Sequence, residues 1–155
     1  METKVCCFIG HRTIDETEVL VEGLSTLIED LITCENTYTF LFGSRGRFNR
    51  LCYELVTKLK EKYPHVKRVY VRAEYPYISD SYKAMLLGEY EDTYFPEKVI
   101  GAGKAAYAER NEELVRNADI CIIYYRESLV PSNCRSGTKI ALEYAQKQKK
   151  RIIMI

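Results

Sequence analysis

The chain has 155 residues, of which 46% are hydrophobic and 29% are charged. This length predicts one domain over residues 1–155 with a substantial hydrophobic core. The formal net charge of +1 provides no overall attraction to nucleic acid or to an anionic membrane, so any anion site must be built locally. No stretch approaches the roughly 20 apolar residues of a membrane span, and the first residues do not form a secretory signal. We therefore expect a cytoplasmic protein without a membrane partner.

The six cysteines are scattered, without a C-x-x-C pair or a Cys/His group. This spacing favours buried free thiols over a disulfide framework or a metal site, and we expect no metal and no cofactor. Cys6 and Cys7 are adjacent in an apolar run, so their side chains should point to opposite faces of one strand. Cys134 is the exception, because it lies in a loop close to the ligand site predicted below.

The N-terminal half alternates between strand and helix patterns. Short apolar runs predict strands, and apolar residues at helical spacing follow each run. The four residues Thr13–Glu16 match a capping box and predict the first helix start. The third strand is less apolar, which suggests a sheet edge. We predict strands at 5–9, 38–42 and 66–72, with helices at 13–31 and 48–59.

The C-terminal half repeats this alternation after a tyrosine-rich tract over residues 74–103, which we interpret as a short helix near 81–88 within loop. Helices at 104–117 and 136–150 each precede an apolar strand, at 120–125 and 151–155. The pattern predicts an α/β, Rossmann-like three-layer sandwich with a mostly parallel sheet of about five strands and helices on both faces. The first and fourth strands should be central in the order 3-2-1-4-5, which reverses between them.

Three glycine-containing loops each lie between a predicted strand and a predicted helix. A helix N-terminus offers free N–H donors and the positive end of the helix dipole, and glycine allows a phosphate to approach the backbone. Any single loop could be a simple turn. Three at one sheet edge, each with an arginine in or beside it, predict a site for a phosphate-bearing ligand. The loops are Gly10-His11-Arg12, Gly43-Ser44-Arg45-Gly46 and Ser136-Gly137-Thr138, the last following Arg135.

Two further positions could belong to this site. His11 is interpreted as a ligand contact or a structural residue, because the sequence shows no nucleophile beside it. Arg110 and Asn111 share a helical face with Tyr107 and Leu114. A guanidinium on an apolar stripe needs a carboxylate or an anionic ligand, unless it lies at an exposed helix edge.

Glu143 is the acidic residue that soonest follows the third glycine loop, so it is the first candidate for a general acid. Lys139 and Lys147 lie four residues to either side of it, however, which is the spacing of solvated ion pairs on a helix. The surface interpretation is therefore preferred, and the catalytic residues stay unassigned.

The order of these motifs along the chain resembles the SLOG superfamily, and in particular its small bacterial members of unknown function. The similar segments are 7–12, 43–46, 110–111 before Ala118-Asp119, and 136–138 followed by 143–145. The resemblance implies a Rossmann-like fold and nucleotide-derived ligands. It also implies a pocket lined by Gly10, His11, Arg12, Gly43, Ser44, Gly46, Arg110, Asn111, Ser136, Gly137 and Thr138, and Arg45 could add a phosphate contact.

Relatives in that superfamily suggest two activities. The LONELY GUY phosphoribohydrolases cleave the N-glycosidic bond of nucleoside monophosphates, but their pattern P-G-G-x-G-T-x-x-E is absent here. Glu143 stands two positions too late, about 200° around a helix, and cannot simply inherit the catalytic role. The DNA-processing protein A family binds single-stranded DNA, for which the tyrosines could stack bases, yet the near-neutral charge argues against a nucleic-acid partner.

The sequence therefore favours binding or sensing of a small nucleotide-derived ligand, with N-glycosidic hydrolysis as the alternative function. Self-association into a homo-oligomer is left open.

Overall fold

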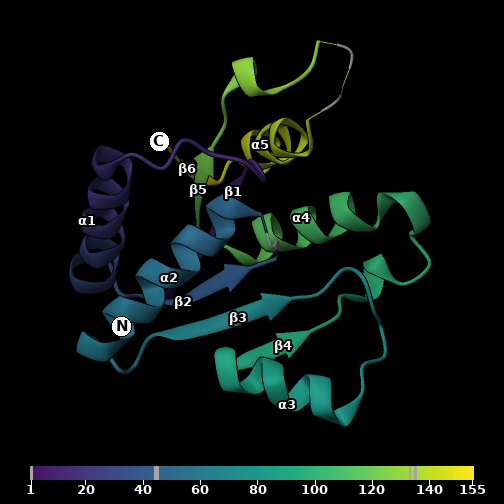
Figure 1. Cartoon of the computed structure of the whole chain (residues 1–155), viewed down its shortest axis with the longest axis horizontal. Coiled ribbons are helices and arrows are strands. Elements are labelled where there is room, and N and C mark those ends of the chain that lie inside the picture. The colour runs from purple at the N-terminus through teal and green to yellow at the C-terminus, as the bar shows by residue number, and fades with distance from the viewer. Residues whose placement is uncertain (1, 44–45, 133, 135) are drawn as a thin grey trace.

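The computed structural model describes residues 2–43, 46–132, 134 and 136–155. Within them, a six-stranded parallel sheet has the order β4-β3-β2-β1-β5-β6 (Figure 1). The strands are β1 (Lys4–Gly10), β2 (Thr37–Phe42), β3 (Lys67–Val71), β4 (Asp92–Tyr94), β5 (Ile120–Tyr124) and β6 (Arg151–Met154), and the helices are α1 (Glu18–Cys34), α2 (Arg47–Lys62), α3 (Asp80–Glu89), α4 (Ala106–Asn117) and α5 (Gly137–Lys147).

The sheet separates two hydrophobic cores. Side chains from α1, α2 and α3 pack on the face that carries Cys6 and Phe8, whereas α4 and α5 cover the face that carries Cys7 and Ile9. The predicted opposite orientation of Cys6 and Cys7 is thereby confirmed, as are the helices on both faces. The predicted reversal is also confirmed, because β1 pairs with β2 on one side and with β5 on the other.

Two predictions about the elements are wrong. The helix does not start at the Thr13–Glu16 box: α1 begins at Glu18, and the Oγ1 of Thr17 accepts the cap hydrogen bond from the Leu20 N–H at 3.1 Å. The third strand is not the sheet edge either. The three-residue strand β4, hidden in the tyrosine-rich tract, pairs with β3 outside it.

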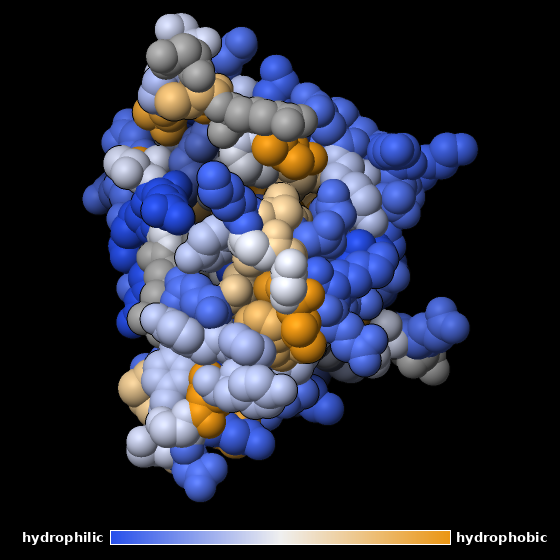
Figure 2. Space-filling model, turned by 90° about the vertical axis from the view of Figure 1, so that its right-hand side faces the viewer, coloured by the Kyte–Doolittle hydropathy of each residue, from blue (hydrophilic) through white to orange (hydrophobic). Residues whose placement is uncertain are grey.

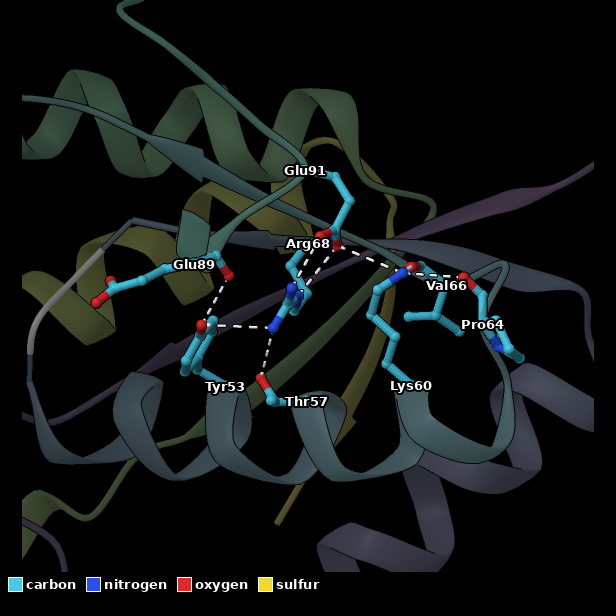
Figure 3. Close-up of polar contacts among 8 residues, drawn as sticks. All are labelled: Tyr53, Thr57, Lys60, Pro64, Val66, Arg68, Glu89 and Glu91. Carbon is cyan, nitrogen blue, oxygen red and sulfur yellow. Dashed lines mark hydrogen bonds and ion pairs between the residues drawn. The ribbon is translucent and has the colours of Figure 1, made fainter. Parts of the chain in front are cut away.

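A polar cluster holds this added strand to α2 (Figure 3). The guanidinium of Arg68 on β3 pairs with the Glu91 carboxylate at 2.8 Å and donates to Thr57 Oγ1 at 3.0 Å. The Tyr53 hydroxyl donates to the carbonyl of Glu89 at 2.7 Å. Both ends of the turn between α3 and β4 are thus fixed to α2, which explains how so short a strand keeps its place.

The described residues include no helix that is both long enough and apolar enough to cross a bilayer.

Candidate functional site

A cavity of about 360 Å³ lies at the carboxyl edge of the sheet, where the loops after β1 and β5 face each other across the reversal point. In parallel α/β sheets this crevice is the usual place for a ligand. We call it the central cavity. Eight of the twelve predicted site residues line it: Gly10, His11, Arg12, Arg110, Asn111, Ser136, Gly137 and Thr138.

A side cavity of about 410 Å³ adjoins the central cavity. It is lined by Gly43 and Gly46, which are also predicted site residues, together with Tyr70 and Glu74. Arg12, Tyr107 and Arg110 line both cavities and so form the wall between them. The remaining two predicted residues, Ser44 and Arg45, lie outside the described residues, as does Arg135.

Figure 2 faces this edge of the molecule. Apolar residues form a broken band down the middle of the face, and hydrophilic residues flank it on both sides (Figure 2). The central cavity has the same mixed character, since Phe8, Leu114 and Pro131 line it beside the arginines. Such a surface suits a ligand with one apolar and one charged part.

Arg110 is the most unusual side chain of the site. It is 6% exposed, although arginine is almost never fully buried unless it is paired. Its Nε donates to Asn111 Oδ1 at 3.0 Å, and its guanidinium lies 5.7 Å from the ring centroid of Tyr107. In the described part of the chain, no carboxylate lies within 4.0 Å of it and its terminal nitrogens have no acceptor. Burial lowers the pKa of Arg110, as expected for a cation removed from water.

Glycines at two strand ends make room for protein side chains. A Cβ on Gly43 would lie 2.5 Å from Cδ of Arg110, and a Cβ on Gly10 would lie 2.3 Å from the buried ring of Phe48. Packing against these side chains already requires glycine at both positions, so the sequence-based reason, that glycine leaves space for a phosphate, stays a prediction there. It fits Gly137, where an added Cβ would meet nothing within 4 Å.

The N-terminus of α5 opens onto the central cavity. Ser136 caps the helix, because its Oγ accepts a hydrogen bond from the Lys139 N–H at 3.2 Å. Gly137 and Thr138 occupy the first helical turn and line the cavity. The first N–H groups of a helix have no partner within the helix, and together with the dipole they attract an anion.

His11 joins the loops on either side of the reversal point. Its Nε2 accepts a hydrogen bond from the backbone N–H of Arg126 at 2.8 Å. This bond requires a neutral imidazole, and burial lowers the pKa of His11 below its ordinary value, with the charge of Arg126 acting in the same direction. The interaction agrees with the structural interpretation of His11, while its position in the cavity wall leaves ligand contact open.

Sequence reasoning missed three residues of the site. Asn49 is 4% exposed and bridges two strand ends, since its Nδ2 donates to the Phe8 carbonyl at 3.2 Å and its Oδ1 accepts from the Gly43 N–H at 3.4 Å. Arg72 and Glu74 follow β3 and line a narrow recess beside Arg110. The signal for Asn49 was a polar residue inside the apolar stripe of α2, whereas the loop after β3 offered no glycine to attract attention.

Glu143 lies away from the central cavity. It is exposed on α5 and lines a separate hollow with Lys139 and Tyr125. It makes no ion pair within 4.0 Å to Lys139 or Lys147, so the expected surface pairs are not formed. Across the described residues, no group of three or more His, Cys, Asp or Glu side chains could hold a metal ion. The arrangement offers cationic and N–H donors beside apolar walls, and this is the chemistry of anion binding.

The chain is distantly similar to a prophage-derived protein. The chain is 28% identical over 144 residues to the uncharacterized SPbeta prophage-derived protein YoqJ of Bacillus subtilis (strain 168), and the match covers 83% of this chain and 81% of that protein. No protein-family profile matches the chain.

Proposed function

We propose that the protein binds or senses a small, phosphate-bearing, nucleotide-derived ligand at the carboxyl edge of its sheet. The observation that carries this proposal is the buried guanidinium of Arg110. It is 6% exposed and lies in the wall between two cavities, and among the described residues no carboxylate lies within 4.0 Å of it, the charge of Glu74 acting only from a greater distance. A buried cation without a counter-charge is costly, so its retention is best explained by an anionic ligand.

Phosphate suits this position for two reasons. Arginine binds phosphate oxygens through a planar fork of donors, and Arg12 adds a second guanidinium to the same wall. The N-terminus of α5 supplies backbone N–H donors from another side of the central cavity. Donors that converge from different elements favour a polyvalent anion over a single carboxylate.

The apolar wall of the central cavity supports a nucleotide over inorganic phosphate. Phe8, Leu114, Val130 and Pro131 line it beside the cationic end. A planar base can be buried against such a surface while the phosphate remains at the arginines. The volume of about 360 Å³ also lies within the range of small-molecule sites. The SLOG resemblance points to the same ligand class.

The test is to identify the small molecule that remains bound to the natively purified protein by mass spectrometry, and then to measure affinities for a panel of nucleotides by calorimetry. Gly137→Val should weaken the binding at least about ten-fold, because the new side chain extends into open space at the cavity wall. Gly23→Val is the matched control. Gly23 is exposed on α1, is also free of neighbours within 4 Å, and should leave the affinity unchanged. Failure of every nucleotide to bind or to stabilise the protein would refute the proposal.

N-glycosidic hydrolysis is the second candidate function, and the carboxylate of Glu74 in the side cavity is the observation in its favour. The described wall of the central cavity contains no Asp or Glu, so binding without turnover is preferred. Incubation with purine and pyrimidine monophosphates should therefore release no ribose 5-phosphate. Release that is abolished by Glu74→Gln would reverse this preference.

A further inference from the structure

We propose that the side cavity is a sugar–phosphate subsite in which the carboxylate of Glu74 accepts hydrogen bonds from sugar hydroxyls of the ligand, so that ribose is preferred over 2-deoxyribose. This inference rests on the proposed function, because it assumes that the phosphate binds at Arg110. It adds a specificity-determining residue in a loop where the sequence indicated no site.

The lining of the side cavity includes both hydrogen-bond donors and a carboxylate. Arg12 and Arg110 present guanidinium groups, and Tyr70, which is 7% exposed, lines the same cavity and carries a hydroxyl. Glu74 is the carboxylate among the residues that line this cavity. An ionised carboxylate can only accept hydrogen bonds, so its partner on a ligand must be a donor.

Among the described residues, Glu74 forms no ion pair with the neighbouring arginines. Within the described ranges, no nitrogen of Arg12, Arg72 or Arg110 lies within 4.0 Å of its carboxylate. The charge of Glu74 is nevertheless close enough to influence the pKa of Arg110. The carboxylate is therefore near the guanidinium groups while its oxygens remain available.

A phosphate held by Arg110 would be repelled by Glu74, so the carboxylate must face a different part of the same ligand. The neighbour of the phosphate in a nucleotide is the sugar, whose hydroxyls are neutral donors. Two adjacent hydroxyls of ribose match the two oxygens of one carboxylate, as acidic residues do for ribose in other parallel α/β folds. The volume of about 410 Å³ leaves room for a pentose phosphate.

The test uses probes without a base, so that the apolar wall of the central cavity does not contribute to binding. Ribose 5-phosphate, 2-deoxyribose 5-phosphate and inorganic phosphate are titrated into ¹⁵N-labelled protein at pH 7.5, and dissociation constants are obtained from amide and arginine Nε–H shifts. One hydrogen bond to a charged group corresponds to about a ten-fold difference in affinity or more. Ribose 5-phosphate should therefore bind at least about ten-fold more tightly than the deoxy sugar.

Glu74→Gln should reduce this preference to about two-fold or less and should strengthen the binding of inorganic phosphate, because the repulsion is removed. Glu143→Gln is the matched control, since Glu143 is an exposed carboxylate that does not line the side cavity. It should leave all three affinities unchanged.

The outcomes separate the two proposals. Equal affinity of the wild-type protein for the two sugars, or an unchanged preference in Glu74→Gln, overturns the sugar subsite while phosphate binding at Arg110 stands. If Glu74→Gln increases the affinity for all three probes equally, the sugar subsite is also overturned, because Glu74 would then act only through its charge. If no probe shifts a cavity residue, both the subsite and the phosphate site are refuted.

Discussion

Replacing Arg110 with methionine should stabilise the ligand-free protein and abolish phosphate binding. Methionine has a similar length and flexibility, so it can keep the apolar contacts of the side chain with Leu114 and above Gly43. It removes a cation that is 6% exposed and forms no ion pair within 4.0 Å among the described residues. If Arg110 served only to stabilise the fold, its replacement would lower the free energy of unfolding and leave phosphate binding unchanged.

The expected change in the free energy of unfolding follows from the interactions that Arg110→Met removes. Replacing a buried ion pair by well-packed apolar residues is often neutral or stabilises a protein by about 1–4 kcal/mol. Against this, the variant loses the hydrogen bond to Asn111 and the contact with the Tyr107 ring, each worth about 1 kcal/mol. With the middle of that range, about 2.5 kcal/mol, the net gain should be about 0.5 kcal/mol in the free energy of unfolding, or a Tm increase of about 1–2 °C for a chain of this length.

The assay is urea denaturation at 25 °C, without and with a phosphate-bearing ligand at about 100 times its dissociation constant. The wild-type protein should gain about 2.7 kcal/mol from the ligand, and the variant should gain little. Arg50→Met is the control, because the half-exposed Arg50 lines neither the central nor the side cavity and should change stability by less than about 0.5 kcal/mol. A loss of 2 kcal/mol or more in ligand-free Arg110→Met, with the ligand response retained, would refute the reasoning.

Three further predictions concern the frame of the site. Gly10→Ala should lower the free energy of unfolding by about 1–3 kcal/mol in urea denaturation, since its Cβ would overlap the fully buried Phe48, and unchanged stability would contradict the packing described. Gly43→Ala should weaken phosphate affinity measured by calorimetry and also lower stability, because its Cβ would lie 2.5 Å from Cδ of Arg110 and 2.9 Å from Cδ1 of the buried Leu114, and unaltered affinity would count against this role. Because burial lowers the pKa of folded His11, the unfolded chain binds more protons just below pH 6.5, so stability should fall as the pH drops from about 7 to 5. His11→Gln, which keeps an acceptor for the Arg126 N–H, should flatten that pH dependence in thermal unfolding, and an equal slope in both proteins would exclude His11 as its source.

The strand and helix pattern was predictable because each buried strand is a short apolar run and each helix has an apolar stripe. The structure confirms the order of five strands on this basis. β4 escaped prediction because it contains three residues, Asp92, Thr93 and Tyr94, and too short a segment has no periodicity to detect. It is held by tertiary contacts instead, notably the hydrogen bond from the Thr93 hydroxyl to the Tyr70 carbonyl at 2.8 Å.

The start of α1 illustrates a second limit. Thr13 and Glu16 match the capping box, but the Glu16 carboxylate pairs with Arg47 of α2 in a bidentate contact. Thr17 then supplies the cap. The local sequence indicated the first cap, and a contact between Glu16 and a residue 31 positions away accompanies the use of Thr17 instead.

The sequence indicated the residues of the candidate site that lie in glycine-containing loops. It did not indicate the residues that join the site only because distant elements pack together. Spacing on α4 placed Arg110 on one face with Tyr107 and Leu114, and all three line the central cavity. Spacing left open whether a carboxylate would meet Arg110, because that depends on which elements lie opposite. Glu74 lines the side cavity because it follows β3, and the position of β3 in the sheet could not be read from residue spacing.

The missed strand and the central residue of the site are connected. α4 is the crossover from β4, at one edge of the sheet, to β5 on the other side of β1, so it passes the point where the strand order reverses. A residue near the start of this helix can therefore reach the loops after β1, β2 and β5 together, and Arg110 does so because Gly43 has no side chain to block it. The crossover therefore places Arg110 beside both cavities, and the course of the chain from β4 to β5 explains why a residue of α4 lies between the loops of strands that are far from it in sequence.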